Sequence, residues 1–197
     1  MRIPQPLLRA VPLVAALLAA CGDPFALPPA NSPTSERIVI LYALSGTPLS
    51  TPSAFNLVTG IEVRTDRTPD FDIALEFAPD SALGLGTTGD TVAALLPRGA
   101  LGFAADPGVM IDSTTPWDSL RLAPIDGYTT DKAVRIDSGD VVIAASRAQG
   151  CNFGLVRPLY AKIRIDQIDR AQRRIVTLTV TNPNCGYRGL GPGIPVQ

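Results

Sequence analysis

The sequence predicts an all-β fold, a single antiparallel β-sandwich or another β-rich domain with one disulfide. Short apolar or alternating segments are separated by turn residues, which is typical of strands joined by tight loops. Helix-forming residues are scarce, since the 197 residues include only three glutamates and two lysines. A chain of this length can form one ordinary domain with its own core.

The expected strands follow one another from residue 37 onward. Residues 37–44 and 139–146 are apolar runs with the length and β-branched content of buried strands. Four further segments alternate apolar and polar side chains, as half-buried strands do: residues 61–65, 70–77, 159–165 and 174–181. Two short segments also fit helices, residues 91–96 as a short helix and residues 166–174 as a single turn.

Residues 1–20 have the parts of an export signal. Arg2 and Arg9 supply positive charge, and the apolar run that follows is too short to span a bilayer. The ending Leu-Ala-Ala-Cys at residues 18–21 resembles the lipobox of bacterial lipoproteins. This resemblance implies cleavage before Cys21, acylation of Cys21 with palmitate-type chains, and anchoring in the cell envelope. An ordinary signal-peptidase site is the alternative.

The chain is therefore divided into a signal peptide (1–20), a lipidated cysteine with a proline-rich tether (21–35), and an all-β domain (36–197). The four prolines of the tether indicate a part-extended, part-flexible spacer. Gly22 stands where lipoproteins retained in the inner membrane carry Asp, so we expect the outer membrane. Export to an oxidising compartment predicts that Cys151 and Cys185 form a disulfide.

Composition argues against several functions. The chain has no histidine, which excludes histidine-based triads, histidine-ligated zinc and bis-histidine haem. A net charge of -1 provides no basic field for nucleic acid. Serine-nucleophile motifs are also missing from the sequence. We expect neither catalysis nor a bound metal.

Two patterns suggest sites that the surrounding sequence does not favour. Residues 84–89 match GxGxxG, but a dinucleotide site needs this loop between a strand and a helix, so an inter-strand loop is expected. Asp70 and Asp72 are spaced like paired carboxylates, or like calcium ligands together with Asp66 or Glu76. The simpler interpretation places Asp70, Asp72 and Glu76 on the solvent side of a strand, opposite Phe71, Ile73, Leu75 and Phe77.

Several segments, in order, resemble the HmuY-like lipoproteins, surface-anchored β proteins found mainly in Bacteroidetes. These segments are FNLVTG (55–60), DFDIAL (70–75), residues 117–131, and YAKIRI (160–165). The family implies haem held at one end of the β structure by two axial side chains, commonly histidines and in some members methionines. Here only Met110 and Tyr128 lie in suitable places, so we expect the scaffold to be kept and haem binding lost.

The candidate ligand-binding residues are Met110, Tyr128, Tyr187 and Arg188. Tyr187 and Arg188 are residue types that concentrate binding energy, although Tyr187 also fits a closing tail packed on the sheet. We expect a non-catalytic, lipid-anchored envelope domain that binds a hydrophobic small molecule or a protein partner. A haem-binding lipoprotein of the HmuY type is the alternative. An apolar pocket near Met110 and Tyr128 would favour the small molecule, and a flat aromatic patch the protein.

Overall fold

The computed structural model describes residues 26–104, 107–152 and 154–196. Within them the chain forms strands joined by turns and loops, with a single short 3-10 helix. The elements are β1 (Ser35–Tyr42), β2 (Ala54–Asn56), β3 (Ile61–Val63), β4 (Ile73–Pro79), β5 (Thr91–Pro97), η1 (Arg98–Leu101), β6 (Gly108–Ile111), β7 (Val134–Ile136), β8 (Val141–Ala145), β9 (Gln149–Asn152), β10 (Leu155–Arg157), β11 (Tyr160–Asp169) and β12 (Arg174–Asn182).

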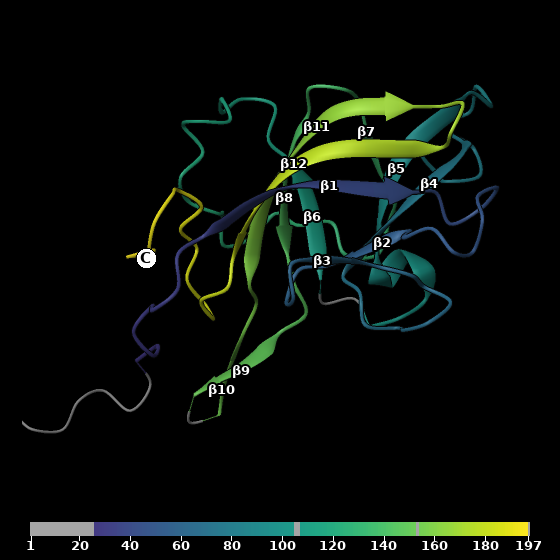
Figure 1. Cartoon of the computed structure of the whole chain (residues 1–197). Coiled ribbons are helices and arrows are strands. Elements are labelled where there is room, and N and C mark those ends of the chain that lie inside the picture. Colours follow the sequence, from purple (N-terminus) through teal and green to yellow (C-terminus); the bar gives the residue numbers. More distant parts are fainter. Residues whose placement is uncertain (1–25, 105–106, 153, 197) are drawn as a thin grey trace, which may run out of the picture.

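Two antiparallel sheets of five strands each enclose one apolar core (Figure 1). The first sheet has the order β1-β12-β11-β8-β6, and the second has the order β3-β2-β4-β5-β7. Both sheets contribute fully buried side chains to this core, among them Val39 and Ile165 from the first and Ile73, Leu75 and Leu95 from the second. The expected all-β, sandwich-like fold is therefore confirmed.

Most of the expected strands are present. The prediction of a helix at residues 91–96 is wrong. These residues form β5, which pairs with β4 along its whole length and with β7 on its other side. Its run of small and apolar residues is buried on both faces, so tertiary packing decides its conformation. Residues 166–174 contain no helical turn either, because β11 continues to Asp169 and a tight turn with Arg173 at φ 51° leads into β12.

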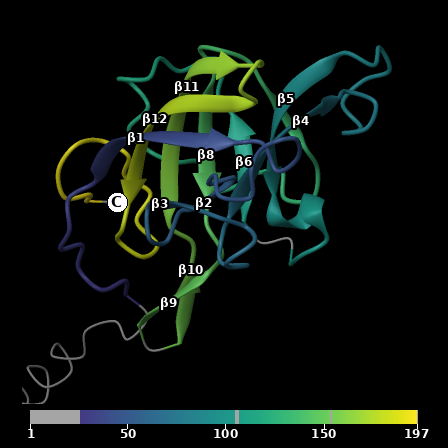
Figure 2. The ribbon, with the colours of Figure 1, turned by 45° about the vertical axis from the view of Figure 1, so that its right-hand side comes forward.

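The disulfide between Cys151 and Cys185 is present, with a Cα–Cα distance of 5.5 Å. It ties β9 to the loop after β12. The two-stranded ribbon β9–β10 projects from the body of the domain beside this bond (Figure 2). An added cross-link across 34 positions restricts the unfolded chain and so favours the folded domain.

Contacts of the domain begin before the expected boundary at Glu36. The backbone N–H groups of Asn31 and Ser32 both donate to the Asn184 side chain, at 3.0 and 3.2 Å. The Thr34 N–H donates to the Gly193 carbonyl at 3.0 Å. The second half of the proline-rich segment therefore lies along the C-terminal segment. No helix in the described ranges is long and apolar enough to cross a membrane.

The solvent-facing position expected for Asp72 is wrong, because its side chain is fully buried. Its carboxylate accepts hydrogen bonds from the Leu57 N–H (2.7 Å), the Arg147 N–H (2.9 Å) and Arg147 Nε (3.0 Å). Asp72 directly precedes β4 in one sheet, and Arg147 follows β8 in the other. The regular alternation begins only at Ile73, so Phe71 packs in a separate cluster beneath Leu96.

Replacing Asp72 tests how much its ion pair with Arg147 contributes to the stability of the domain. We expect Asp72→Asn to lower the free energy of unfolding by about 3 kcal/mol, because Arg147 loses its buried counter-charge. The matched control is Asp70→Asn, since Asp70 also pairs with Arg147 (2.9 Å) but its side chain is 70% exposed. That control should cost less than about 1 kcal/mol. Equal losses of unfolding free energy for the two variants, measured by urea denaturation, would show that the buried Asp72 contributes no more than the exposed Asp70.

Candidate binding site

The outer face of the first sheet carries a second apolar cluster, which we call the outer cluster. Residues 112–133 and the segment after β12 fold back over β8 and β11 and cover it. Its buried members come from all these parts of the chain: Leu120, Ala123, Val141, Ile143, Ala145, Tyr160 and Leu190. The candidate residues predicted from sequence gather around this cluster or in the segments that cover it.

Met110 and Tyr128 both pack against the outer cluster as half-buried side chains. The Tyr128 hydroxyl donates to the Pro124 carbonyl at 3.0 Å, and its ring centroid lies 6.3 Å from that of Tyr160. Burial raises the pKa of Tyr128, the neighbouring Tyr160 adds to the rise, and Arg188 opposes it. Ligation of ferric haem by the Tyr128 oxygen would break its hydrogen bond to the Pro124 carbonyl. These two residues do not fit a pair of axial haem ligands.

The Arg188 side chain and the backbone of Tyr187 take part in hydrogen bonds that hold the C-terminal segment in place. Arg188 Nη1 donates to the Ala123 carbonyl at 2.9 Å, while the Ala123 N–H donates to the Arg188 carbonyl at 2.8 Å. The Asn182 side chain donates to the Tyr187 carbonyl at 2.8 Å. The structure thus places Arg188 beside the residues that cover the outer cluster. Cys21 lies outside the described residues.

A cavity of about 290 Å³ lies at the edge of the outer cluster, and no sequence pattern predicted it. Its floor is one row of residues across the first sheet, in which Val180 is paired with Glu36 on one side and Lys162 on the other. Its walls are Trp117, Asp118 and Arg121 from the loop, with Leu190 and Pro192 from the C-terminal segment. We call it the Trp117 cavity.

Lys162 is the unusual residue of this cavity. It is only 5% exposed, whereas lysines are almost never fully buried unless they are paired. Its Nζ donates to the carbonyls of Trp117 (2.9 Å) and Leu120 (3.1 Å), and lies 4.3 Å from the Trp117 ring centroid. Burial lowers the pKa of Lys162. Among the described residues no carboxylate lies within 4.0 Å of it. Carbonyl dipoles and the indole face stabilise this cation instead.

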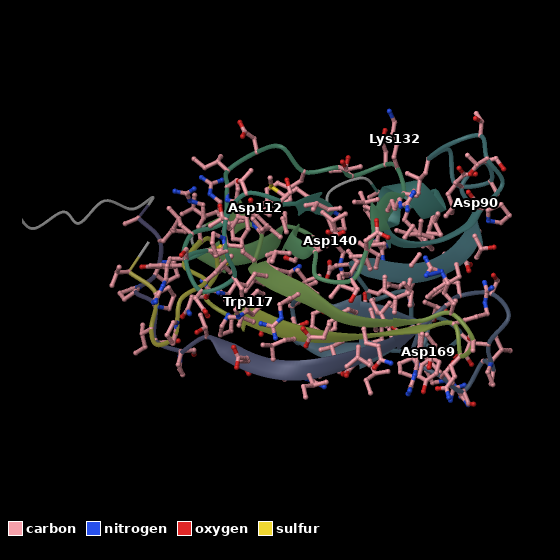
Figure 3. The ribbon with its side chains drawn as sticks, turned by 90° about the horizontal axis from the view of Figure 1, so that it is seen from above. Asp90, Asp112, Trp117, Lys132, Asp140 and Asp169 are labelled. Carbon is pink, nitrogen blue, oxygen red and sulfur yellow. A yellow bond between two sulfur atoms is a disulfide. The ribbon has the colours of Figure 1, made fainter. Side chains whose placement is uncertain are left out.

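A second hollow of about 410 Å³ is lined by Trp117 together with Asp112 and Asp140. Figure 3 labels these three side chains. The polar groups of this hollow already have partners. Burial alone would raise the pKa of Asp112, but hydrogen bonds from Thr114 and Thr115 outweigh it and lower the pKa to about 2. Arg164 pairs with Asp166 at 2.6 Å. The Trp117 cavity, whose buried lysine has only neutral hydrogen-bond partners among the described residues, is the better candidate site.

The two other patterns found in the sequence are structural. Residues 84–89 join β4 to β5 as an inter-strand loop, as expected, and the Asp80 carboxylate accepts from Gly89 N–H (2.7 Å) and the Thr88 hydroxyl (2.9 Å). Asp66 pairs with Arg64, and Glu76 pairs with Arg173. In the part of the chain that the structure describes, no group of three or more Cys, Asp or Glu side chains is placed to hold a metal.

Comparison of the chain with protein-family models and with curated proteins found no match. The likeness to HmuY-like lipoproteins therefore rests on the short segments quoted above. Its functional implication, haem binding, depends on residues that this chain uses for packing.

A hemin titration tests that interpretation of Met110 and Tyr128. We expect the chain from residue 22 onward, without the signal and the lipidated cysteine, to give no saturable Soret change, because the Tyr128 hydroxyl is engaged and Met110 packs against the outer cluster. The Met110→Ala variant should give the same spectrum as the wild type. A saturable Soret change that disappears in Met110→Ala would contradict this and identify Met110 as an axial ligand.

Proposed function

We propose that the protein is a non-catalytic, lipid-anchored domain of the bacterial cell envelope that binds a small amphipathic ligand in the Trp117 cavity. The lipobox at residues 18–21 supports the anchor, with the outer membrane as the expected location. The disulfide agrees with an exported protein. The observation that carries the binding function is the buried Lys162 beside an open cavity.

The lining of the cavity defines the chemistry of its ligand. Trp117, Val180 and Leu190 offer an apolar surface, and the indole ring suits a flat group. Lys162 and Arg121 supply two positive charges, and only Arg121 is exposed enough to contact an anion directly. Glu36 and Asp118 at the rim favour a ligand that also carries polar or cationic groups. A molecule with a flat apolar part and one anionic group fits this arrangement best.

The dye 1-anilinonaphthalene-8-sulfonate has both features and serves as the probe. Trp117 is the only tryptophan of the chain, so energy transfer from tryptophan to the dye reports binding near the cavity. We expect saturable transfer that Arg121→Gln weakens about tenfold, since a hydrogen bond to a charged group contributes about 1.5 kcal/mol.

The control for this experiment is Arg170→Gln. Arg170 is an exposed arginine in the turn between β11 and β12, outside the cavity lining. This variant loses the same charge and should bind the dye like the wild type. If Arg121→Gln and Arg170→Gln bind equally, the Trp117 cavity is not the binding site.

The anchor is tested separately in cells. We expect Cys21→Ser to abolish incorporation of labelled palmitate and to move the protein out of the membrane fraction, because the acylated thiol is lost. The control Cys151→Ser removes a different cysteine and leaves the lipobox intact, so it should retain the label. Labelling of Cys21→Ser at the wild-type level would refute the lipoprotein assignment.

A further inference from the structure

One end of the domain exposes large aliphatic side chains that a soluble protein normally covers. Leu122, Ile125 and Ile194 are 38%, 75% and 55% exposed, and Val196 is 90% exposed. Leu122, Ile194 and Val196 line one shallow groove together with two prolines of the C-terminal segment. Ile125 lies three residues beyond Leu122 in the same loop. We call these four residues the apolar end. Such exposed patches mark interaction surfaces.

The chain that leads from Cys21 first contacts the loop after β12 and then passes the apolar end at Thr34. Leu27 packs against Gly186, where its side chain leaves no room for a Cβ. Thr34 donates from its N–H to Gly193 (3.0 Å) and from its hydroxyl to Gly191 (2.8 Å). Both views show the beginning of β1 and the C-terminal segment on one side of the molecule (Figures 1 and 2).

The distance between the anchor and this end is limited by covalent geometry. Five residue steps separate Cys21 from Ala26, the first described residue, and they span at most about 18 Å when fully extended. The eight residues of β1 then run away from this end for roughly 25 Å. An acyl chain on Cys21 therefore holds the side of the domain where β1 begins, which includes the apolar end, closer to the bilayer than the far end of β1.

We propose that the apolar end is a membrane-contact surface, whose aliphatic side chains enter the interfacial region of the bilayer that holds the Cys21 lipid. The inference rests on the lipid anchor of the proposed function. The contact need not be strong alone, because the anchor keeps the surface at high effective concentration near the lipid.

The experiment uses the processed, acylated chain reconstituted in vesicles of phosphatidylethanolamine and phosphatidylglycerol. The fluorophore NBD is attached to Ile125→Cys at the apolar end, or to Leu49→Cys as the control. Leu49 is 74% exposed and follows the far end of β1. Acylation of Cys21 and the Cys151–Cys185 disulfide leave the introduced thiol as the reactive one.

We expect NBD at residue 125 to shift to the blue on reconstitution and to be quenched by doxyl-labelled lipid, while NBD at residue 49 stays unchanged. If the protein remains with the vesicles but both probes stay hydrated, the membrane-contact surface is overturned and the anchor stands. If the protein does not remain with the vesicles, the anchor itself fails, and the surface with it. A blue shift at residue 125 that appears without lipid and rises with protein concentration would assign the apolar end to a second copy of the chain.

Discussion

The ion pair between the buried Asp72 and the half-buried Arg147 joins the two sheets, and the fit between them depends on it. Asp72 stands before the central strand β4, and Arg147 follows β8 in the opposite sheet. The same carboxylate also fixes the backbone after β2 through the Leu57 N–H. A charge without solvent contact is tolerated only when its lone pairs are occupied, and here three donors occupy them. The relative position of the sheets is therefore specified by polar geometry as well as by apolar packing.

Lys162 plays a comparable role on the outside of the first sheet. It holds the loop that carries Trp117 against β11 through two backbone carbonyls and the indole ring. The same loop forms one wall of the cavity, so the cation stabilises the wall and supplies the charge inside it. The stability of this loop therefore depends on a lysine whose burial is offset by two carbonyls and the indole ring.

The long strands and the disulfide were predictable from sequence because their signals are local or compositional. Alternation over residues 159–165 and 174–181 specifies a hairpin, and export predicts a bond between Cys151 and Cys185. The burial of Asp72 was not predictable, because its partner Arg147 is 75 positions away and the backbone before β4 departs from strict alternation. The Trp117 cavity escaped prediction for a similar reason. The alternation of residues 159–165 correctly predicts that Lys162 points away from the core. Its burial comes from the loop that carries Trp117, which folds back over the outer face of the sheet.

The hydrogen bond from Thr34 to Gly193 brings two distant parts of the sequence side by side. A short linker joining the two ends would therefore need little rearrangement, and new ends opened in the loop at 84–89 would leave every strand intact. In Figure 1 that loop, between β4 and β5, lies on the side away from the C-terminal segment. If a lipid signal were added at its new N-terminus, such a circular permutant would be anchored by the opposite end of the domain. Under the proposed anchor, the order of the chain thus also decides which end of the domain would face the membrane.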